Sequence, residues 1–170
     1  MITTNYKNYC KSNQTYTDSK MTGVQGTSFT YDVSYGLIDY GGFYGISAGR
    51  ATSLTEAGDI GFYLGSGDTP PTEADYTLAI PITSGLSVSS SSGGTTTKDD
   101  QIVRRYTFAV YNTSEETITV REIGACSKMA YGSKKYYLTL IERTVLDEPV
   151  VLAPGESASF TYKVHHNFAW

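Results

Sequence analysis

The sequence predicts an all-β protein, an antiparallel β-sandwich of the immunoglobulin-like or jelly-roll-like kind with an extended N-terminal arm. Charged residues make up only 18% of the chain, below the roughly 25% of typical soluble domains. Ser, Thr, Gly and 15 Tyr take their place. Tyr and Thr favour half-buried pleated surfaces, and Gly supplies turns. Apolar and polar residues alternate repeatedly, and no segment predicts a substantial helix.

Residues 1–26 are polar, carry several tyrosines and show no periodicity, which predicts an extended arm rather than a packed element. Such an arm either stays mobile or lies on a neighbouring molecule. Tyr6, Tyr9 and Tyr16 favour the second alternative, because tyrosine combines a large apolar contact area with a polar group.

Residues 27–83 are predicted to form the β-rich first half of the sandwich. Phe29 and Tyr31 share one face of a strand with Val33 and Tyr35, while the intervening residues are polar. The Ser/Gly/Thr segment at 84–101, "SGLSVSSSSGGTTTKDDQ", is predicted to be a flexible linker or a long hairpin tip, since its centre cannot bury apolar area.

Residues 102–170 are predicted to form the second half, in one compact domain with 27–83. "RRYTFAVYN" and "TITVREIGA" have strand periodicity. Ile123 breaks the phase set by Ile118 and Val120, so either the strand ends near Glu122 or a bulge lies there. The end of the chain, "PVVLAPGESASFTYKV", predicts two strands joined by a Pro-Gly turn.

The segment "GSGDTPPTEADYTL", residues 65–78, is the strongest candidate for a site. A phosphate-binding loop would need a helix after it and a Lys-Ser/Thr pair, which this segment lacks. A calcium loop would need acidic residues at alternating positions, whereas Asp68, Glu73 and Asp75 are irregularly spaced. The favoured interpretation is a stiff connection between strands.

Local chemistry supports that connection. Gly65 and Gly67 would permit a positive φ, and the Pro70-Pro71 step predicts an extended run. "PTEADY" then predicts a short helical turn capped by Thr72, with the carboxylate of Asp75 or Glu73 returning to the backbone.

The sequence predicts no catalytic residue, no cofactor and no metal ion. His165 and His166 are adjacent on a predicted strand and would point to opposite faces, so they cannot share a metal. Cys10 and Cys126 are expected to be free thiols. The sequon at Asn112-Thr113-Ser114 is expected to be a chance match, because the N-terminus does not resemble a secretion signal.

The charge and hydropathy patterns also exclude classes of partner. A formal net charge of −4 offers no electrostatic footprint for nucleic acid. No apolar run is long enough to predict a membrane span.

Two patterns in a fixed order resemble tailed-bacteriophage virion proteins. The first is "IGFYLGSGDTPPTEADYTLAIPI", similar to a "G-(ST)-G-x-T-x-P-T-x-x-D-Y-x-L" segment of that family. The second combines "YTFAVYNTSEETITVREIG" with the later "LAPGESASFTYKV", which resemble that family's C-terminal portion. Together they cover residues 60–164.

The resemblance implies a non-enzymatic structural component of the virion: capsid decoration, or a head–tail or tail accessory protein. It implies partners among other virion proteins and copies of the chain itself, in a symmetric homo-oligomer made in the host cytoplasm. It carries over no catalytic residues. Residues expected at assembly interfaces are Tyr6, Tyr9, Tyr16, Pro70, Pro71 and Trp170.

Two other function classes compete with this interpretation. A carbohydrate-binding or adhesin module, for example for a host-surface glycan, would use exposed rings such as Tyr35, Tyr40, Phe43 and Tyr44 as stacking platforms. A hydrolase with unrecognised acids would draw on Asp59, Asp68 and Asp75.

Overall fold

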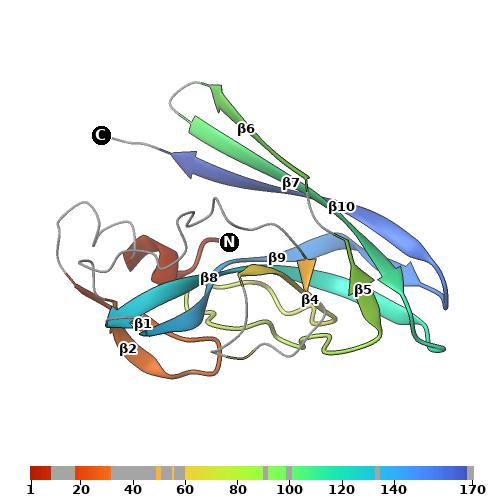
Figure 1. The fold of residues 1–170 in the computed structure, drawn as a ribbon, viewed down its shortest axis with the longest axis horizontal. Coiled ribbons are helices and arrows are strands. Elements are labelled where there is room, and N and C mark those ends of the chain that lie inside the picture. The colour runs from red at the N-terminus through yellow and green to blue at the C-terminus, as the bar shows by residue number, and fades with distance from the viewer. Residues whose placement is uncertain are drawn as a thin grey trace.

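The computed structural model describes residues 1–8, 18–31, 49–50, 55, 60–89, 92–98, 101–132 and 135–167 (Figure 1). Within these ranges the chain is built from strands, and only residues 4–8 are helical. The predicted all-β class is confirmed. Every pairing between the described strands is antiparallel except that of β3 with β4.

Two sheets form the body of the sandwich, and a hairpin adds to one end. The β8–β9 sheet has the order β3-β4-β8-β9 and consists of β3 (Gly49–Arg50), β4 (Gly61–Gly65), β8 (Ile118–Gly132) and β9 (Lys135–Leu152). The β7–β10 sheet has β7 at its centre and consists of β5 (Leu86–Val88), β6 (Ser92–Lys98), β7 (Gln101–Asn112) and β10 (Ser157–Asn167). The hairpin consists of β1 (Ser19–Thr22) and β2 (Ser28–Tyr31).

The main core lies between the two sheets and is rich in aromatic rings. Phe62 of β4 stacks on Phe108 of β7 with centroids 5.2 Å apart, and Phe108 stacks in turn on Phe160 of β10 at 5.6 Å. The predicted alternation is confirmed along both strands: Tyr106, Phe108 and Val110 are buried on β7, and Phe160 and Tyr162 are buried on β10. Apolar burial of this kind is the dominant stabilising term.

A smaller second core covers the opposite face of the β8–β9 sheet. Its buried members are Val24, Tyr63, Leu78, Cys126, Leu138 and Leu140. Cys126 is a free thiol, as predicted, and burial raises its pKa; Cys10 lies outside the described residues. The β8–β9 sheet is therefore covered on both faces, which explains why β8 is buried continuously from Glu122 to Ser127.

Two irregularities in the β8–β9 pairing decide which side chains face this second core. The first lies between Val120 and Glu122, where the sequence predicted either a strand end or a bulge; β8 continues, so the bulge is confirmed. The second lies between Ala125 and Cys126 and leaves Ile141 as an extra residue on β9. Because a bulge shifts the alternation by one residue, it brings Arg143 onto the face that carries Glu122.

The described part of the N-terminal segment packs on the chain's own domain. The main-chain N–H of Thr3 donates to the carbonyl of Ile141 at 3.0 Å, and the N–H of Arg143 donates to the carbonyl of Met1 at 3.0 Å. Thr3 and Asn5 are buried. The sequence predicted an extended arm that stays mobile or lies on a neighbouring molecule, whereas the described part of this segment packs on its own chain. The physical reason is that the edge of β9 offers main-chain groups that need partners.

The Ser/Gly/Thr segment at 84–101 contains strands rather than a flexible linker. β5 and β6 both pair with β7, and Ser92 to Lys98 run in register against Thr107 to Gln101. Of the two predicted alternatives, the structure has the hairpin. β5 adds Leu86 to the buried core, whereas β6, which has no apolar residue, completes the sheet through main-chain pairing alone.

Candidate functional site

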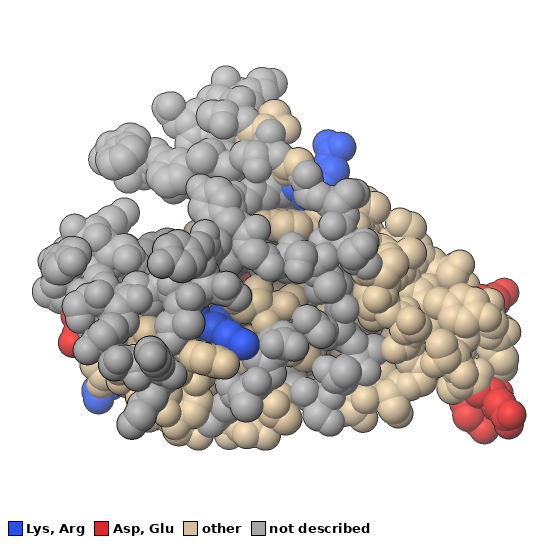
Figure 2. Space-filling view, in the orientation of Figure 1, with Lys and Arg blue, Asp and Glu red and all other residues tan. Residues whose placement is uncertain are grey.

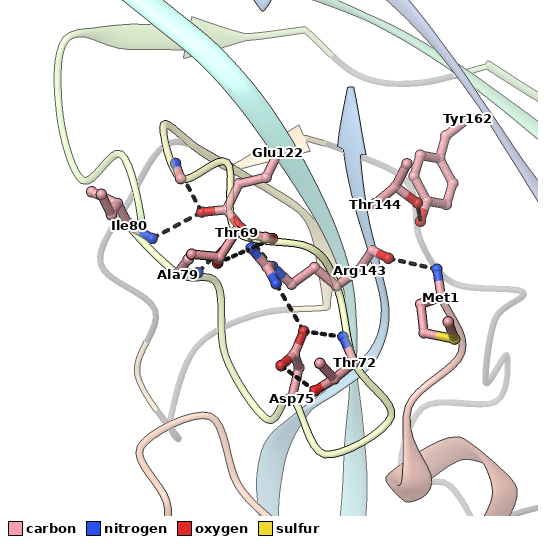
Figure 3. A network of polar contacts seen from close by, with 11 residues as sticks. Met1, Thr69, Thr72, Asp75, Ala79, Ile80, Glu122, Arg143, Thr144 and Tyr162 are labelled. Atoms are coloured by element: carbon pink, nitrogen blue, oxygen red, sulfur yellow. Dashed lines mark hydrogen bonds and ion pairs between the residues drawn. The ribbon is translucent and has the colours of Figure 1, made fainter. Parts of the chain in front are cut away.

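The candidate site is a loop of residues 66–82, here called the clamped loop, which leaves β4 and crosses the outer face of the β8–β9 sheet. Its two ends are joined by main-chain hydrogen bonds: the N–H of Ser66 donates to the carbonyl of Ile80 at 2.8 Å, and the N–H of Ile82 donates to the carbonyl of Leu64 at 2.9 Å. It contains most of the segment that the sequence singled out. Its conformation is decided by two charged residues of the sheet beneath it (Figure 3).

Glu122 of β8 is the acceptor at the centre of the loop. Its side chain has no exposed surface. Its carboxylate accepts main-chain hydrogen bonds from Gly67 at 3.2 Å, Ala79 at 3.1 Å and Ile80 at 2.8 Å. It also accepts from Nε of Arg143 at 2.6 Å. A buried carboxylate is tolerated only when it is paired and hydrogen-bonded in this way.

Arg143 of β9 extends the network to the far side of the loop. Its Nη1 donates to Oδ2 of Asp75 at 2.8 Å, and its Nη2 donates to the carbonyl of Thr69 at 3.0 Å. Burial alone would lower the pKa of Arg143, but the hydrogen bonds with Asp75 and Glu122 outweigh burial and raise it. One guanidinium therefore joins the sheet to two separate points of the loop.

Asp75 closes the short turn that the sequence predicted. The main-chain N–H of Thr72 donates to Oδ2 of Asp75 at 3.0 Å, and the Thr72 hydroxyl donates to Oδ1 at 2.8 Å. The N–H of Asp75 donates back to the Thr72 carbonyl at 3.3 Å. The predicted turn over "PTEADY" and its capping are confirmed, with Asp75 as the returning carboxylate, but none of its residues is helical. Glu73 instead forms an exposed ion pair with Lys7.

The two glycines have a different role from the predicted one. Neither Gly65 nor Gly67 has a positive φ. A Cβ atom would lie 2.4 Å from Oε1 of Glu122 at position 65 and 2.7 Å from the same atom at position 67. At position 65 the Glu122 carboxylate occupies the space that a side chain would need, and at position 67 the carboxylate shares that space with the Cβ atom of Ala79, at 2.6 Å.

Together these contacts form a hydrogen-bond network that holds the loop on the sheet. Each oxygen of Glu122 accepts at least one hydrogen bond, and three nitrogens of Arg143 donate to protein acceptors. Among the residues that the structure describes, no group of three or more His, Cys, Asp or Glu side chains is placed to hold a metal ion. The arrangement holds the loop on the sheet through Glu122 and Arg143, while Tyr76 and Ile80 of the loop remain exposed.

Replacing Asp75 with asparagine should flatten the dependence of stability on pH. Burial alone would raise the pKa of Asp75, but hydrogen bonds from Thr72 and Arg143 outweigh burial and lower it. A carboxyl group with a lowered folded-state pKa stabilises the fold above its unfolded pKa, about 3.9, and loses that contribution as the pH falls through the folded value. Urea unfolding from about pH 7 to about pH 3 should therefore show a smaller acid loss in Asp75→Asn. Equal acid losses in both proteins would contradict this.

The structure places only some of the residues predicted from the sequence. Tyr6 is partly buried against the main core, Pro70 is exposed on the clamped loop, and Pro71 is half-buried there. His165 and His166 are consecutive residues of β10, opposite Val103 and Ile102 of β7. Outside the described residues lie Tyr9, Tyr16, Trp170, Tyr35, Tyr40, Phe43, Tyr44 and Asp59.

The two central residues of the network, Glu122 and Arg143, were not predicted as site residues. One signal was present in the sequence: the alternation of apolar residues along the strand breaks after Val120, and Glu122 lies at that break. No comparable local signal marked Arg143, because its partners lie 21, 68 and 74 residues away in the chain.

Comparisons with known proteins add no relative to this description. A scan against protein-family models, a search of curated proteins and a search of solved structures each returned no match. In the part of the chain that the structure describes, no helix has the length and apolar character needed to cross a bilayer.

Proposed function

We propose that this chain is a non-enzymatic structural component of a bacteriophage virion that assembles through protein–protein contacts, as a capsid decoration or a head–tail or tail accessory protein. Two lines of support converge on it. The first is the resemblance of residues 60–164 to tailed-phage virion proteins, which includes the clamped loop. The second is the way in which the sheet holds that loop.

The observation that carries the proposal is a rigid loop with exposed apolar side chains. Tyr76 is 42% exposed and Ile80 is 58% exposed, although both are large and apolar. Two hollows of about 360 and 320 Å³ are both lined by Ala74, Asp75 and Tyr76. Exposed aromatic and aliphatic side chains on a preorganised surface are typical of contacts between proteins, because little entropy is lost when they bind.

The charged groups of the network support the same role. Glu122 and Arg143 are almost fully buried and bind loop atoms and each other. Buried, mutually satisfied charges hold one conformation, and specificity of structure is a known use of such pairs. A surface that must match a partner repeatedly in a symmetric assembly needs that constancy.

The direct test is to look for the chain in particles. Purified phage particles from the source host should contain the protein in stoichiometric amounts by mass spectrometry, and it should cosediment with them. Isolated protein should rebind to particles from which it has been stripped. A chain that is absent from the particles and does not bind them would overturn the proposal.

Substituting both Pro70 and Pro71 with glycine should weaken binding to particles more than it weakens folding. Each change destabilises the fold by about 0.4–1 kcal/mol, chiefly by raising the entropy of the unfolded chain, whereas it removes the stiffness of the exposed loop. Pro149→Gly, an exposed proline on β9 outside the loop, is the matched control. Urea unfolding and particle cosedimentation would be compared. Equal effects of the loop and control variants on cosedimentation would count against the loop as the contact surface.

A further inference from the structure

The outer face of the β7–β10 sheet carries two like charges side by side. Arg105 of β7 and Lys163 of β10 are directly opposite each other in the register of the pairing, and both are exposed. Like charges at directly opposed positions destabilise a sheet. The cation pair, as Arg105 and Lys163 are called below, is therefore a position where a negative partner would stabilise the structure.

No described residue supplies that negative partner within the molecule. Neither cation takes part in an ion pair with another described residue. The other described side chains on this face of β7 and β10 are uncharged: Val103, Thr107, Ala109, Tyr111, Ser157, Ser159 and Thr161. Figure 2 shows basic atoms standing above these strands.

The opposite charge is gathered at one end of the sandwich. Glu115 and Glu116 lie in the turn between β7 and β8, and Glu156 lies in the turn between β9 and β10; all three are exposed. Glu115, Glu116 and Glu156 are called the acidic end below. Figure 1 places these two turns at the right-hand end of the molecule, where Figure 2 shows acidic atoms. Tyr111, 47% exposed, lies beside them and offers an apolar contact.

Asn112 joins the two turns and gives the acidic end a fixed shape. It is fully buried, and its Nδ2 donates to the carbonyls of Glu116 at 2.7 Å and Leu152 at 2.9 Å. Its main-chain N–H donates to the carbonyl of Glu156 at 2.8 Å. Its side-chain amide is thus engaged inside the fold. The carboxylates of Glu115 and Glu116 are therefore presented from a preorganised pair of turns.

The acidic end cannot neutralise the cation pair of its own molecule. Arg105 and Asn112 are seven positions apart on β7, and Glu156, the residue just before β10, is seven positions from Lys163. At about 3.3 Å per residue this is roughly 23 Å, well beyond the screening length of about 8 Å at physiological salt. The complementary charges can meet only between molecules.

We propose that the acidic end of one copy docks on the cation pair of a second copy, end to face. Charge complementarity identifies the occupant: an acidic tip with an adjacent tyrosine fits an exposed basic pair whose neighbours on this face of β7 and β10, as far as the structure describes their side chains, are uncharged. Because every copy carries both surfaces, a two-fold arrangement in which each acidic end meets the other copy's cation pair gives a dimer, whereas a one-way contact gives a ring or an open chain. The contact rests on the proposed function in that it supplies the self-association step of the assembly.

The test uses the pure protein in sedimentation velocity or light scattering. The wild-type chain should be larger than its 18.5 kDa monomer at about 0.01 M salt and monomeric at about 1 M, because the screening length falls from about 30 Å to about 3 Å. The variant Arg105→Glu/Lys163→Glu and the variant Glu115→Lys/Glu116→Lys should each raise the dissociation constant at least about tenfold.

A mixture of the two reversed variants should associate again. The first variant keeps its acidic end and the second keeps its cation pair, so one native contact forms; the two reversed surfaces also complement each other. The control Lys20→Glu/Lys128→Glu changes the net charge by the same amount as Arg105→Glu/Lys163→Glu. Its substitutions lie away from this face, so it should leave the association unchanged.

The outcomes separate this contact from the proposed function. A wild-type chain that is monomeric at low salt, or a mixture that fails to associate, would overturn the contact. An association lost equally in the control variant would overturn it too, because net charge would then be the cause. Particle cosedimentation tests the proposed function independently of all these results.

Discussion

Replacing Glu122 with alanine is expected to destabilise the protein by about 3–5 kcal/mol, because the substitution leaves a buried guanidinium without its closest partner. It also leaves three main-chain N–H groups without their acceptor, those of Gly67, Ala79 and Ile80. An unsatisfied buried donor carries a desolvation cost of its own. Urea unfolding measures the loss, and hydrogen exchange at the three amides reports whether the loop has been released.

Two further variants make this result specific. Glu148→Ala removes an exposed carboxylate from β9 and should change stability by no more than about 0.5 kcal/mol. In a double-mutant cycle with Arg143→Met, the second substitution should cost much less once Glu122 is absent, because the two side chains act as a unit. Additive losses, or amides that remain protected in Glu122→Ala, would show that the carboxylate does not hold the loop.

Replacing Phe62 with alanine is expected to lower the free energy of unfolding by about 3–5 kcal/mol. Phe62 is fully buried and is the ring of β4 that contacts three rings of the opposite sheet: Phe108 at 5.2 Å, Tyr106 at 5.2 Å and Tyr162 at 5.0 Å. Its removal leaves a cavity between the two sheets and forfeits these ring contacts.

Val151→Ala is the control for this substitution, because Val151 is 59% exposed on β9. It should change the free energy of unfolding by no more than about 0.5 kcal/mol. Phe62→Leu should fall between the two variants, since it keeps part of the buried volume. A loss below about 1 kcal/mol in Phe62→Ala would mean that the two sheets do not share the core described above.

Local pattern predicted the elements well wherever one face of a strand is buried. The alternation along β7 and β10 appears in the structure as buried Phe108 and Phe160 between neighbours that are exposed or half-buried. The broken phase at Ile123 appears as a bulge. These features follow from the two-residue period of the pleat, which any strand with one apolar face must display.

The same reasoning failed where main-chain groups or spatial neighbours decide the outcome. The Ser/Gly/Thr segment became β6 because its backbone completes the edge of β7. Gly65 and Gly67 were assigned to turn conformations, whereas they make room for a carboxylate 57 and 55 residues further along the chain. Neither the pairing of β6 nor the close approach of the carboxylate to the glycines produces a periodic pattern of residues in the sequence.

The sequence by itself determined the β-class, the strands of the second half, and the turn in which Thr72 and Asp75 cap one another, because each depends on residues close together in the chain. Only the tertiary structure decided that Glu122, Arg143 and Asp75 would meet, and that this meeting would hold the loop. A buried charge must find its partners in space. The register and bulges of β8 and β9 put Glu122 and Arg143 on one face of the sheet, and from there Arg143 contacts Asp75 of the loop, 68 positions away in the chain, at 2.8 Å.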